Sequence, residues 1–129
     1  MESNPSILER LKKTCSMSKR SALLLLGDIL DACLKIQNYT VDFTYEEFSK
    51  HEMVIDAVIR NFEIIGEAAN RLPEDFKDNH PEIDWHRIRG FRNRIVHDYF
   101  GVDLSILWKI KNENLPAIIE KIEILLDQK

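Results

Sequence analysis

The scarcity of glycine and proline is the feature that most constrains the fold of this chain. Only four glycines and four prolines occur among its 129 residues. Between them, apolar residues recur at intervals of three and four, which is the period of an amphipathic helix. No segment alternates between apolar and polar residues as a half-buried strand would. The sequence therefore predicts an all-α fold, an up-and-down bundle of about five helices.

The length of the chain indicates one main domain. A chain of 129 residues can bury roughly two-thirds of its unfolded surface, so a conventional hydrophobic core suffices. We expect a single helical domain over residues 18–129 and an N-terminal appendage over residues 1–17. Within the appendage, Asn4-Pro5 is typical of the start of a short helix. The next helix is expected over about residues 19–37.

Composition also indicates the compartment and the kind of partner. Cys15 and Cys33 show no metal-ligand or CxxC spacing, so we interpret both as free thiols in a reducing cytoplasm. The longest apolar run, Ala22–Leu26, is too short to span a bilayer, and we expect a cytoplasmic protein without membrane contact. The formal net charge of -4 argues against broad, nonspecific duplex binding. Any nucleic acid should therefore meet one confined patch.

Local signals predict several helix boundaries. The segment Thr44-Tyr45-Glu46-Glu47 has the pattern of a capping box and should begin a short helix. Asp84 is expected to cap a basic helix, which Gly101 would end as a left-handed C-cap. Asp103 should cap the last helical stretch, and Pro116 should bend or divide it.

A long helix is expected over about residues 52–72, and its two faces differ in chemistry. Gly66 lies in its middle, where glycine is about 1 kcal/mol less favourable than alanine, and this favours the close approach of another helix. The apolar face comprises Val54, Val58, Phe62, Ile65, Ala69 and Leu72, and the polar face Arg60, Glu63, Glu67 and Arg71.

A basic segment interrupts this acidic protein. From His86 to His97 the chain has four arginines and no acidic residue. Within it, Arg92 offers a permanently charged guanidinium and His97 an imidazole that titrates near neutral pH, a pairing that suits chemistry on phosphate. On an ideal helix, Asn93 would share a line with His97, four residues later. Tyr99 would lie almost in line with Arg92, so that the polar groups occupy one broad face.

One imidazole is only half of an acid–base pair. RNA cleavage by the 2′-hydroxyl needs a base on the attacking oxygen and an acid on the leaving oxygen, each typically worth 10² to 10⁴-fold. A two-fold dimer would supply second copies of Arg92 and His97 across a shared cleft, and no cofactor or metal is expected. The spacing alone also fits a structural role. In that role Arg92 and Arg94 would pair with acids of the facing helix, Glu63 or Glu67.

The other histidines and the tryptophans have simpler interpretations. We expect the histidines to be solvated residues at helix boundaries and the tryptophans to be core or interface anchors. The residues concerned are His51, His80 and His86, and Trp85 and Trp108.

An ordered series of segments points to a family. The segments are Leu26–Leu30, Ala57–Ala68, Pro81–Trp85 and Arg92–Asp103. Over roughly residues 19–122 the series resembles the HepT-like toxins of the HEPN superfamily. The resemblance implies a homodimeric, metal-independent endoribonuclease, the toxin of a type VII-like toxin–antitoxin system. Its partner would be a minimal nucleotidyltransferase antitoxin.

The resemblance also implies roles for single residues. The family's catalytic arginine and histidine fall on Arg92 and His97, and its supporting polar residue falls on Asn93. Its modified tyrosine falls on Tyr99, to which the antitoxin would transfer AMP from ATP. The added phosphodiester would compete with RNA for the guanidinium of Arg92. The remaining arginines of the basic segment are expected to bind RNA: Arg87, Arg89 and Arg94.

Two other functions use the same residues differently. The chain could be a noncatalytic subunit of a nucleotidyltransferase complex, binding nucleotide or substrate with its basic patch. It could also be a purely structural dimerisation module. The first would form a tight complex without RNA turnover, and the second would tolerate loss of charge at Arg92 and His97.

Overall fold

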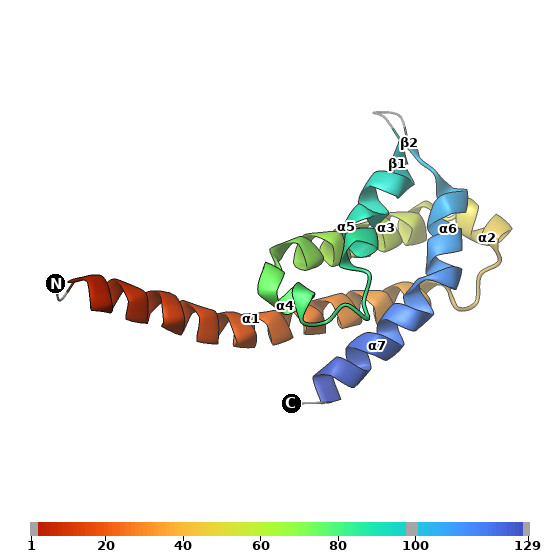
Figure 1. Cartoon of the computed structure of the whole chain (residues 1–129). Helices are drawn as coiled ribbons and strands as arrows, with labels where there is room; N and C mark the ends of the chain where they lie inside the picture. Colours follow the sequence, from red (N-terminus) through yellow and green to blue (C-terminus); the bar gives the residue numbers. More distant parts are fainter. Residues whose placement is uncertain (1–2, 98–100, 128–129) are drawn as a thin grey trace.

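A computed structural model describes residues 3–97 and 101–127, with side chains from residue 20 onward except those of residues 92, 96 and 97. Five of its helices have ten or more residues, which confirms the predicted all-α bundle (Figure 1). The elements are α1 Ser3–Thr40, α2 Tyr45–Ser49, α3 Glu52–Arg71, α4 Glu74–Asp78, α5 Trp85–Ile95, β1 Val96–His97, β2 Gly101–Val102, α6 Leu104–Glu113 and α7 Leu115–Asp127.

The first helix is longer than expected. Instead of a short helix followed by a second one, α1 runs unbroken from Ser3 to Thr40. Its one proline, Pro5, lies in the first turn, where the missing N–H does not interrupt a helical hydrogen bond. The N-terminal part of α1 extends beyond the other helices (Figure 1). The division into an appendage and a domain stays a prediction.

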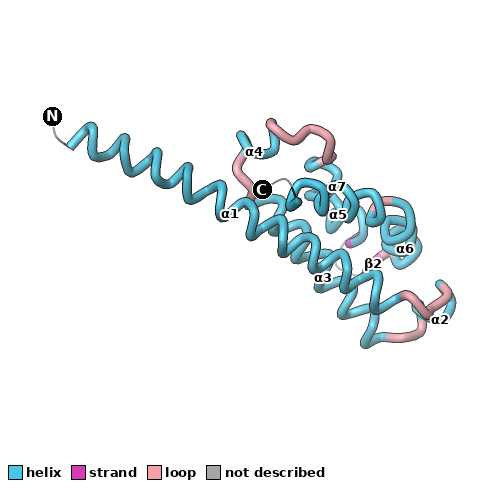
Figure 2. The backbone as a smooth tube through the Cα atoms, turned by 90° about the horizontal axis from the view of Figure 1, so that it is seen from below, coloured by secondary structure: helices cyan, strands magenta, loops and turns pink. Residues whose placement is uncertain are grey.

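The core lies mainly between α1 and α3, which run side by side (Figures 1 and 2). Helix α7 packs on α1, and α5 packs on α3. Burying each large apolar side chain contributes about 1.5–3 kcal/mol, so this contact dominates the stability of the bundle. Residues of these four helices that are completely or almost completely buried include Leu26, Ile29, Ile36, Val58, Phe62, Ile65, Ile88, Phe91 and Ile122.

Side-chain caps confirm several predicted helix starts. The hydroxyl oxygen of Thr44 accepts from the backbone N–H of Glu47 at 3.1 Å, and a carboxylate oxygen of Glu47 accepts from the N–H of Thr44 at 3.0 Å. Asp84 accepts from the N–H of Arg87 at 3.0 Å and so caps α5. Asp103 caps α6. The last stretch is divided into α6 and α7 next to Pro116, as predicted.

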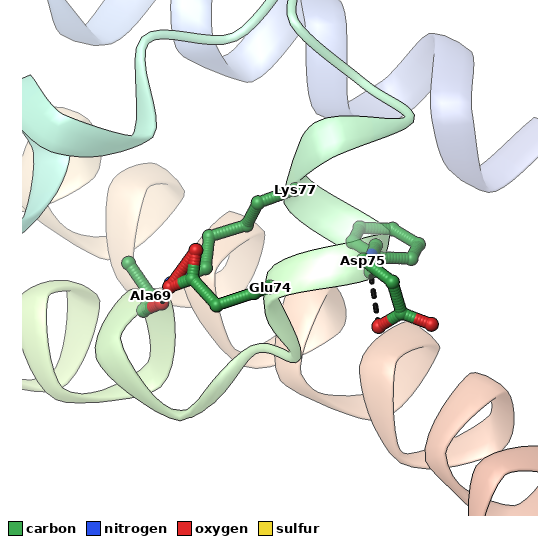
Figure 3. A network of polar contacts seen from close by, with 5 residues as sticks. Ala69, Glu74, Asp75 and Lys77 are labelled. Atoms are coloured by element: carbon green, nitrogen blue, oxygen red, sulfur yellow. Dashed lines mark hydrogen bonds and ion pairs between the residues drawn. The ribbon is translucent and has the colours of Figure 1, made fainter.

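A buried lysine closes the C-terminal end of α3 (Figure 3). The ammonium of Lys77, on α4, donates to the carbonyl oxygen of Ala69 at 3.3 Å. It also lies 3.4 Å from a carboxylate oxygen of Glu74. Because the last carbonyls of a helix have no partner within the helix, this contact satisfies one that would otherwise be buried unpaired.

The basic helix is shorter than predicted. Helix α5 ends at Ile95, and the next two residues form β1, which pairs with β2 in antiparallel fashion, His97 opposite Gly101. The backbone N–H of Asp103 donates to the carbonyl of Ile95 at 2.7 Å and so fixes the end of the ladder. The expectation of a helix ending at a Gly101 C-cap was therefore wrong. Gly101 belongs to a strand because its backbone groups face those of His97 rather than the end of a helix.

Cys33 and the hydropathy of the described helices bear on the predictions of free thiols and of no membrane contact. Cys33 is a free, buried cysteine, and burial raises the pKa of its thiol to about 12. It is therefore unreactive in the folded protein. The side chain of Cys15 lies outside the described ones. In the described part of the chain, no helix combines the length and the hydropathy that a bilayer-spanning segment requires.

Candidate functional site

A polar cleft of about 390 Å³ lies between α3 and α5. Four of its α3 residues follow one another at intervals of three and four, so they form one stripe along the helix. Its two α5 residues are one turn apart. We call it the α3/α5 cleft; it is lined by Arg60, Glu63, Gly66, Glu67, Asn70, Arg89 and Asn93.

Aromatic packing and a glycine set the distance between the two walls. The rings of Phe62 and Phe91 meet edge to face, with centroids 6.0 Å apart and an interplanar angle of 89°. At Gly66, a Cβ atom would lie 3.9 Å from the carbonyl oxygen of Arg89. Helix α5 therefore passes close to Gly66, which confirms the predicted approach of another helix at this residue.

Arg89 is the cation most enclosed by the α3/α5 cleft. Its side chain is partly buried, and its Nε atom is inaccessible to solvent and has no hydrogen-bond partner among the described residues. A guanidinium has donors only, so this N–H needs an acceptor that the described protein atoms do not supply. Arg60 and Glu67 are exposed, and neither belongs to an ion pair between described side chains.

The motif residues are placed only in part. Asn93 lines the α3/α5 cleft. Arg92 occupies the helical position just before it, three residues after Arg89, but its side chain and that of His97 lie outside the described ones. Tyr99 lies outside the described residues. Since His97 is in β1, its predicted place on a helical line with Asn93 was wrong.

The other arginines predicted to bind RNA lie elsewhere on α5. Arg87 forms an ion pair with Asp84 at 3.8 Å and lines a smaller hollow of about 190 Å³ beside α7. Arg94 is exposed, and none of the ion pairs between described side chains includes it, so the alternative pairing with Glu63 or Glu67 is not found for this arginine. The structure thus brings Arg89, and not Arg87, together with Asn93.

The histidines and tryptophans are positioned largely as predicted. His86 is exposed, and exposed His51 accepts from the N–H of Val54 at the start of α3. His80 is half-buried. The tryptophans are packing residues: Trp85 is buried and donates to the His80 carbonyl at 3.0 Å, and Trp108 packs on Phe48 with centroids 4.9 Å apart.

No site role follows from the sequence for the α3 residues of the cleft. Arg60, Glu63 and Glu67 belong to the predicted polar face, and nothing in the sequence distinguishes Asn70. The spacing of three and four along this face was the available signal, because such a stripe on an otherwise packed helix must border solvent or another polar surface. What was missing is the position of α5, which only the tertiary structure gives.

Comparison with known proteins gives a consistent family. The family model "Ribonuclease HepT-like" matches residues 29–125. "Putative RNase MJ1380" of Methanocaldococcus jannaschii is 41% identical over 109 residues, which cover 84% of this chain and 100% of that protein. "Probable ribonuclease HepT" of Thermococcus cleftensis is 42% identical over 105 residues, which cover 81% of this chain and 96% of that protein. No solved structure gave a significant match.

Proposed function

Because the chain belongs to the HepT-like ribonuclease family, we propose that it is a metal-independent endoribonuclease. One observation supports the location of its site: the polar residue next to Arg92 in the motif, Asn93, lines the α3/α5 cleft together with Arg89. Arg89, whose Nε has no partner among the described residues, and the motif residue Asn93 thus share one side of α5. The rest of the chain is acidic, so RNA meets a confined patch.

The proposed reaction assigns a role to each motif residue. The 2′-hydroxyl oxygen attacks the adjacent phosphorus, a 2′-O–P bond forms, and the P–O bond to the 5′-oxygen of the next nucleotide breaks. Arg92 binds the scissile phosphate and stabilises the charge that develops on it. His97 transfers protons, and Asn93 orients these groups. Two copies of the chain form a composite site, in which one imidazole takes the proton of the 2′-hydroxyl and the other gives one to the leaving oxygen.

Regulation follows from the same site. We propose that the chain is the toxin of a type VII-like toxin–antitoxin pair in the cytoplasm, and that a minimal nucleotidyltransferase neutralises it by transferring AMP to Tyr99. The hydroxyl oxygen of Tyr99 attacks the α-phosphorus of ATP, and pyrophosphate leaves. The new phosphodiester is an anion that occupies the guanidinium of Arg92 in place of RNA.

The direct test is cleavage of single-stranded RNA by the purified chain in the presence of EDTA. His97→Ala and Arg92→Ala should each lower the rate at least about 100-fold, the lower end of what one proton-transfer group contributes. His86→Ala, an exposed histidine of the same basic segment, is the matched control and should keep the parent rate. Cleavage that persists in His97→Ala, or that disappears with EDTA in the parent, contradicts the mechanism.

The regulatory part has its own test. Coexpression with a minimal nucleotidyltransferase encoded beside the gene should add one or more AMP units to the intact mass of the chain and abolish cleavage. Tyr99→Phe should keep the unmodified mass under the same conditions. If Tyr99→Phe still gains AMP, the acceptor is another residue. If the chain forms a tight complex with the enzyme but never cleaves RNA, the noncatalytic-subunit function replaces the proposed one.

A further inference from the structure

The α3/α5 cleft extends beyond the motif and has its own chemistry. We propose that it is a nucleotide subsite, in which Arg89 binds the phosphate of one nucleotide of single-stranded RNA while Glu67 and Asn70 bind its guanine base. The inference rests on the proposed function for RNA as the ligand, but the cleft can bind RNA whether or not the chain cleaves it. Nothing in the roles of Arg92 and His97 requires these three residues.

The guanidinium of Arg89 favours an anionic ligand. It lines the open cleft and belongs to no ion pair between described side chains. Because its Nε atom is shielded from solvent, a ligand in the cleft would bind at the two terminal nitrogens. Phosphate oxygens are the acceptors that match the fork of a guanidinium, through two parallel N–H···O bonds. The acids of the cleft wall leave Arg89 available, because no ion pair between described side chains includes it.

The packing of the helices orders the cleft from one end to the other. Phe62 meets Phe91, and Gly66 meets Arg89, so α3 and α5 run in opposite directions along the cleft. Asn93 therefore lies toward the Arg60 end of α3, and Arg89 toward Glu67. The interval of four positions from Arg89 to Asn93 corresponds to a rise of about 6 Å along the helix, which is comparable to one nucleotide step of an extended strand.

The base-binding end favours guanine. A carboxylate only accepts hydrogen bonds, and guanine presents two adjacent donors, N1–H and the 2-amino group, on its Watson–Crick edge. Glu67 is exposed to the cleft and can accept both, while the amide of Asn70 can donate to the neighbouring O6. Uracil offers one donor between two acceptors, which Glu67 would repel. The cleft volume of about 390 Å³ is in the range of sites that hold small ligands.

The test measures RNA binding separately from cleavage. Fluorescence anisotropy of His97→Ala with a short, labelled oligouridine containing one guanosine should show about tenfold tighter binding than with the same strand containing inosine, which lacks the 2-amino group. Glu67→Gln should abolish this difference. Arg89→Lys keeps the charge but not the fork, and should weaken binding several-fold to both strands. Glu123→Gln and Arg71→Lys, exposed residues outside the cleft, are the matched controls and should leave both affinities unchanged.

The outcomes separate the subsite from the nuclease. Equal affinity for guanosine and inosine strands, with no effect of Glu67→Gln or Arg89→Lys, overturns the subsite while cleavage by the parent chain still supports the nuclease. Binding that depends on guanosine and on Glu67, in a chain that cleaves no RNA, supports the subsite and overturns the nuclease. Guanosine monophosphate that displaces the strand at an equal concentration overturns the strand-binding proposal, because the site would then be one for free nucleotides.

Discussion

One cation is enclosed at the C-terminal end of α3 and another in the cleft along the middle of this helix, and the two differ in their hydrogen-bond partners. At the end of the helix, Lys77 is 6% exposed. Its ammonium donates to the carbonyl of Ala69 and forms an ion pair with the carboxylate of Glu74. In the cleft, the Nε atom of Arg89 is shielded from solvent and has no partner among the described residues. The described atoms of the protein therefore complete the first cation site but not the second.

The difference distinguishes architecture from binding. A buried donor left without an acceptor destabilises a protein by about 1–3 kcal/mol, so a satisfied cation such as Lys77 serves the fold. An unsatisfied one such as Arg89 fits the proposed subsite, in which a ligand binds the guanidinium. This criterion favours Arg89 over Arg87, since the guanidinium of Arg87 already faces Asp84.

The largest expected effect on stability comes from the aromatic contact between α3 and α5. Phe91→Ala removes a fully buried ring that packs on Phe62 and should lower the free energy of unfolding by about 3–5 kcal/mol. Arg89 would lose its fixed position beside α3, and RNA binding should fall with it. Urea denaturation measures the first effect and anisotropy the second. A loss below about 1 kcal/mol would mean that α5 does not depend on this contact for its place on α3.

Removal of the satisfied cation should have the next largest effect. Lys77→Met keeps the length of the side chain but leaves the Ala69 carbonyl without its donor, and should lower the free energy of unfolding by about 1–3 kcal/mol. Glu74→Gln should change it by less than about 1 kcal/mol, because the Glu74 side chain is 75% exposed. RNA binding should not change in either variant. If Glu74→Gln is as harmful as Lys77→Met, the ion pair and not the helix cap holds this site.

The pair at the start of α5 separates a cap from an ion pair. Asp84→Ala removes the acceptor for the N–H of Arg87 and should lower the free energy of unfolding by about 1 kcal/mol. Arg87→Ala keeps that cap and removes only an exposed pair, so a change below about 0.5 kcal/mol is expected. Equal losses in thermal or urea unfolding would instead show that the ion pair supports the helix.

The caps also show which helix boundaries can be predicted from the sequence alone. Thr44, Asp84 and Asp103 were predicted correctly because a cap depends on residues three apart in the chain. The end of α5 was predicted wrongly because it depends on β2, which begins six residues after Ile95. The backbone of β2 and of Asp103 forms the hydrogen bonds of the chain at and after Ile95. A two-residue ladder leaves almost no alternating pattern in a sequence.

The candidate site shows the same limit. The spacing from Arg92 to His97 and the family resemblance gave the motif, since both are local in sequence. The cleft joins residues of α3 and α5 that lie at least 19 positions apart, the separation of Asn70 and Arg89, and their approach depends on the ring contact between Phe62 and Phe91. Helical periodicity therefore predicted a polar face on α3 but not that Arg89 would lie opposite it.

A small stabilisation should sharpen the distinction between the cleft and the rest of α3. Gly66→Ala adds a methyl group at an ordinary contact distance from the Arg89 carbonyl, 3.9 Å, and alanine favours the helix by about 0.5–1 kcal/mol. Gly27→Ala, in α1 with nothing within 4 Å, should give the same gain and is the matched control. Gly66 lines the cleft and Gly27 does not, so only Gly66→Ala should weaken RNA binding, by a few-fold. A loss of stability in Gly66→Ala would mean that α5 cannot yield even slightly.

Lys111, a third enclosed cation, should produce the smallest effect, one visible only in its dependence on pH. Its ammonium lies 4.2 Å from the centroid of the Trp108 ring and 3.2 Å from the side-chain oxygen of Asn112, and burial lowers its pKa below 10.5. Below the lowered pKa both folded and unfolded chains carry the proton, and the folded chain bears the desolvation penalty. Between the lowered pKa and 10.5 the unfolded chain binds more protons, so stability rises with pH.

Lys111→Met is neutral at every pH and removes this contribution. Its free energy of unfolding relative to the parent should be most favourable at neutral pH and become less favourable as the pH approaches 10.5. Urea titrations at a series of pH values measure the difference, and Lys109→Met, an exposed lysine of the same helix, controls for the loss of one lysine. A difference that stays constant with pH would mean that the ring and the amide compensate fully for burial. Lys111 would then have full compensation for its burial, as Lys77 does, and Arg89 would be the one enclosed cation of the described residues with a buried donor that lacks a partner.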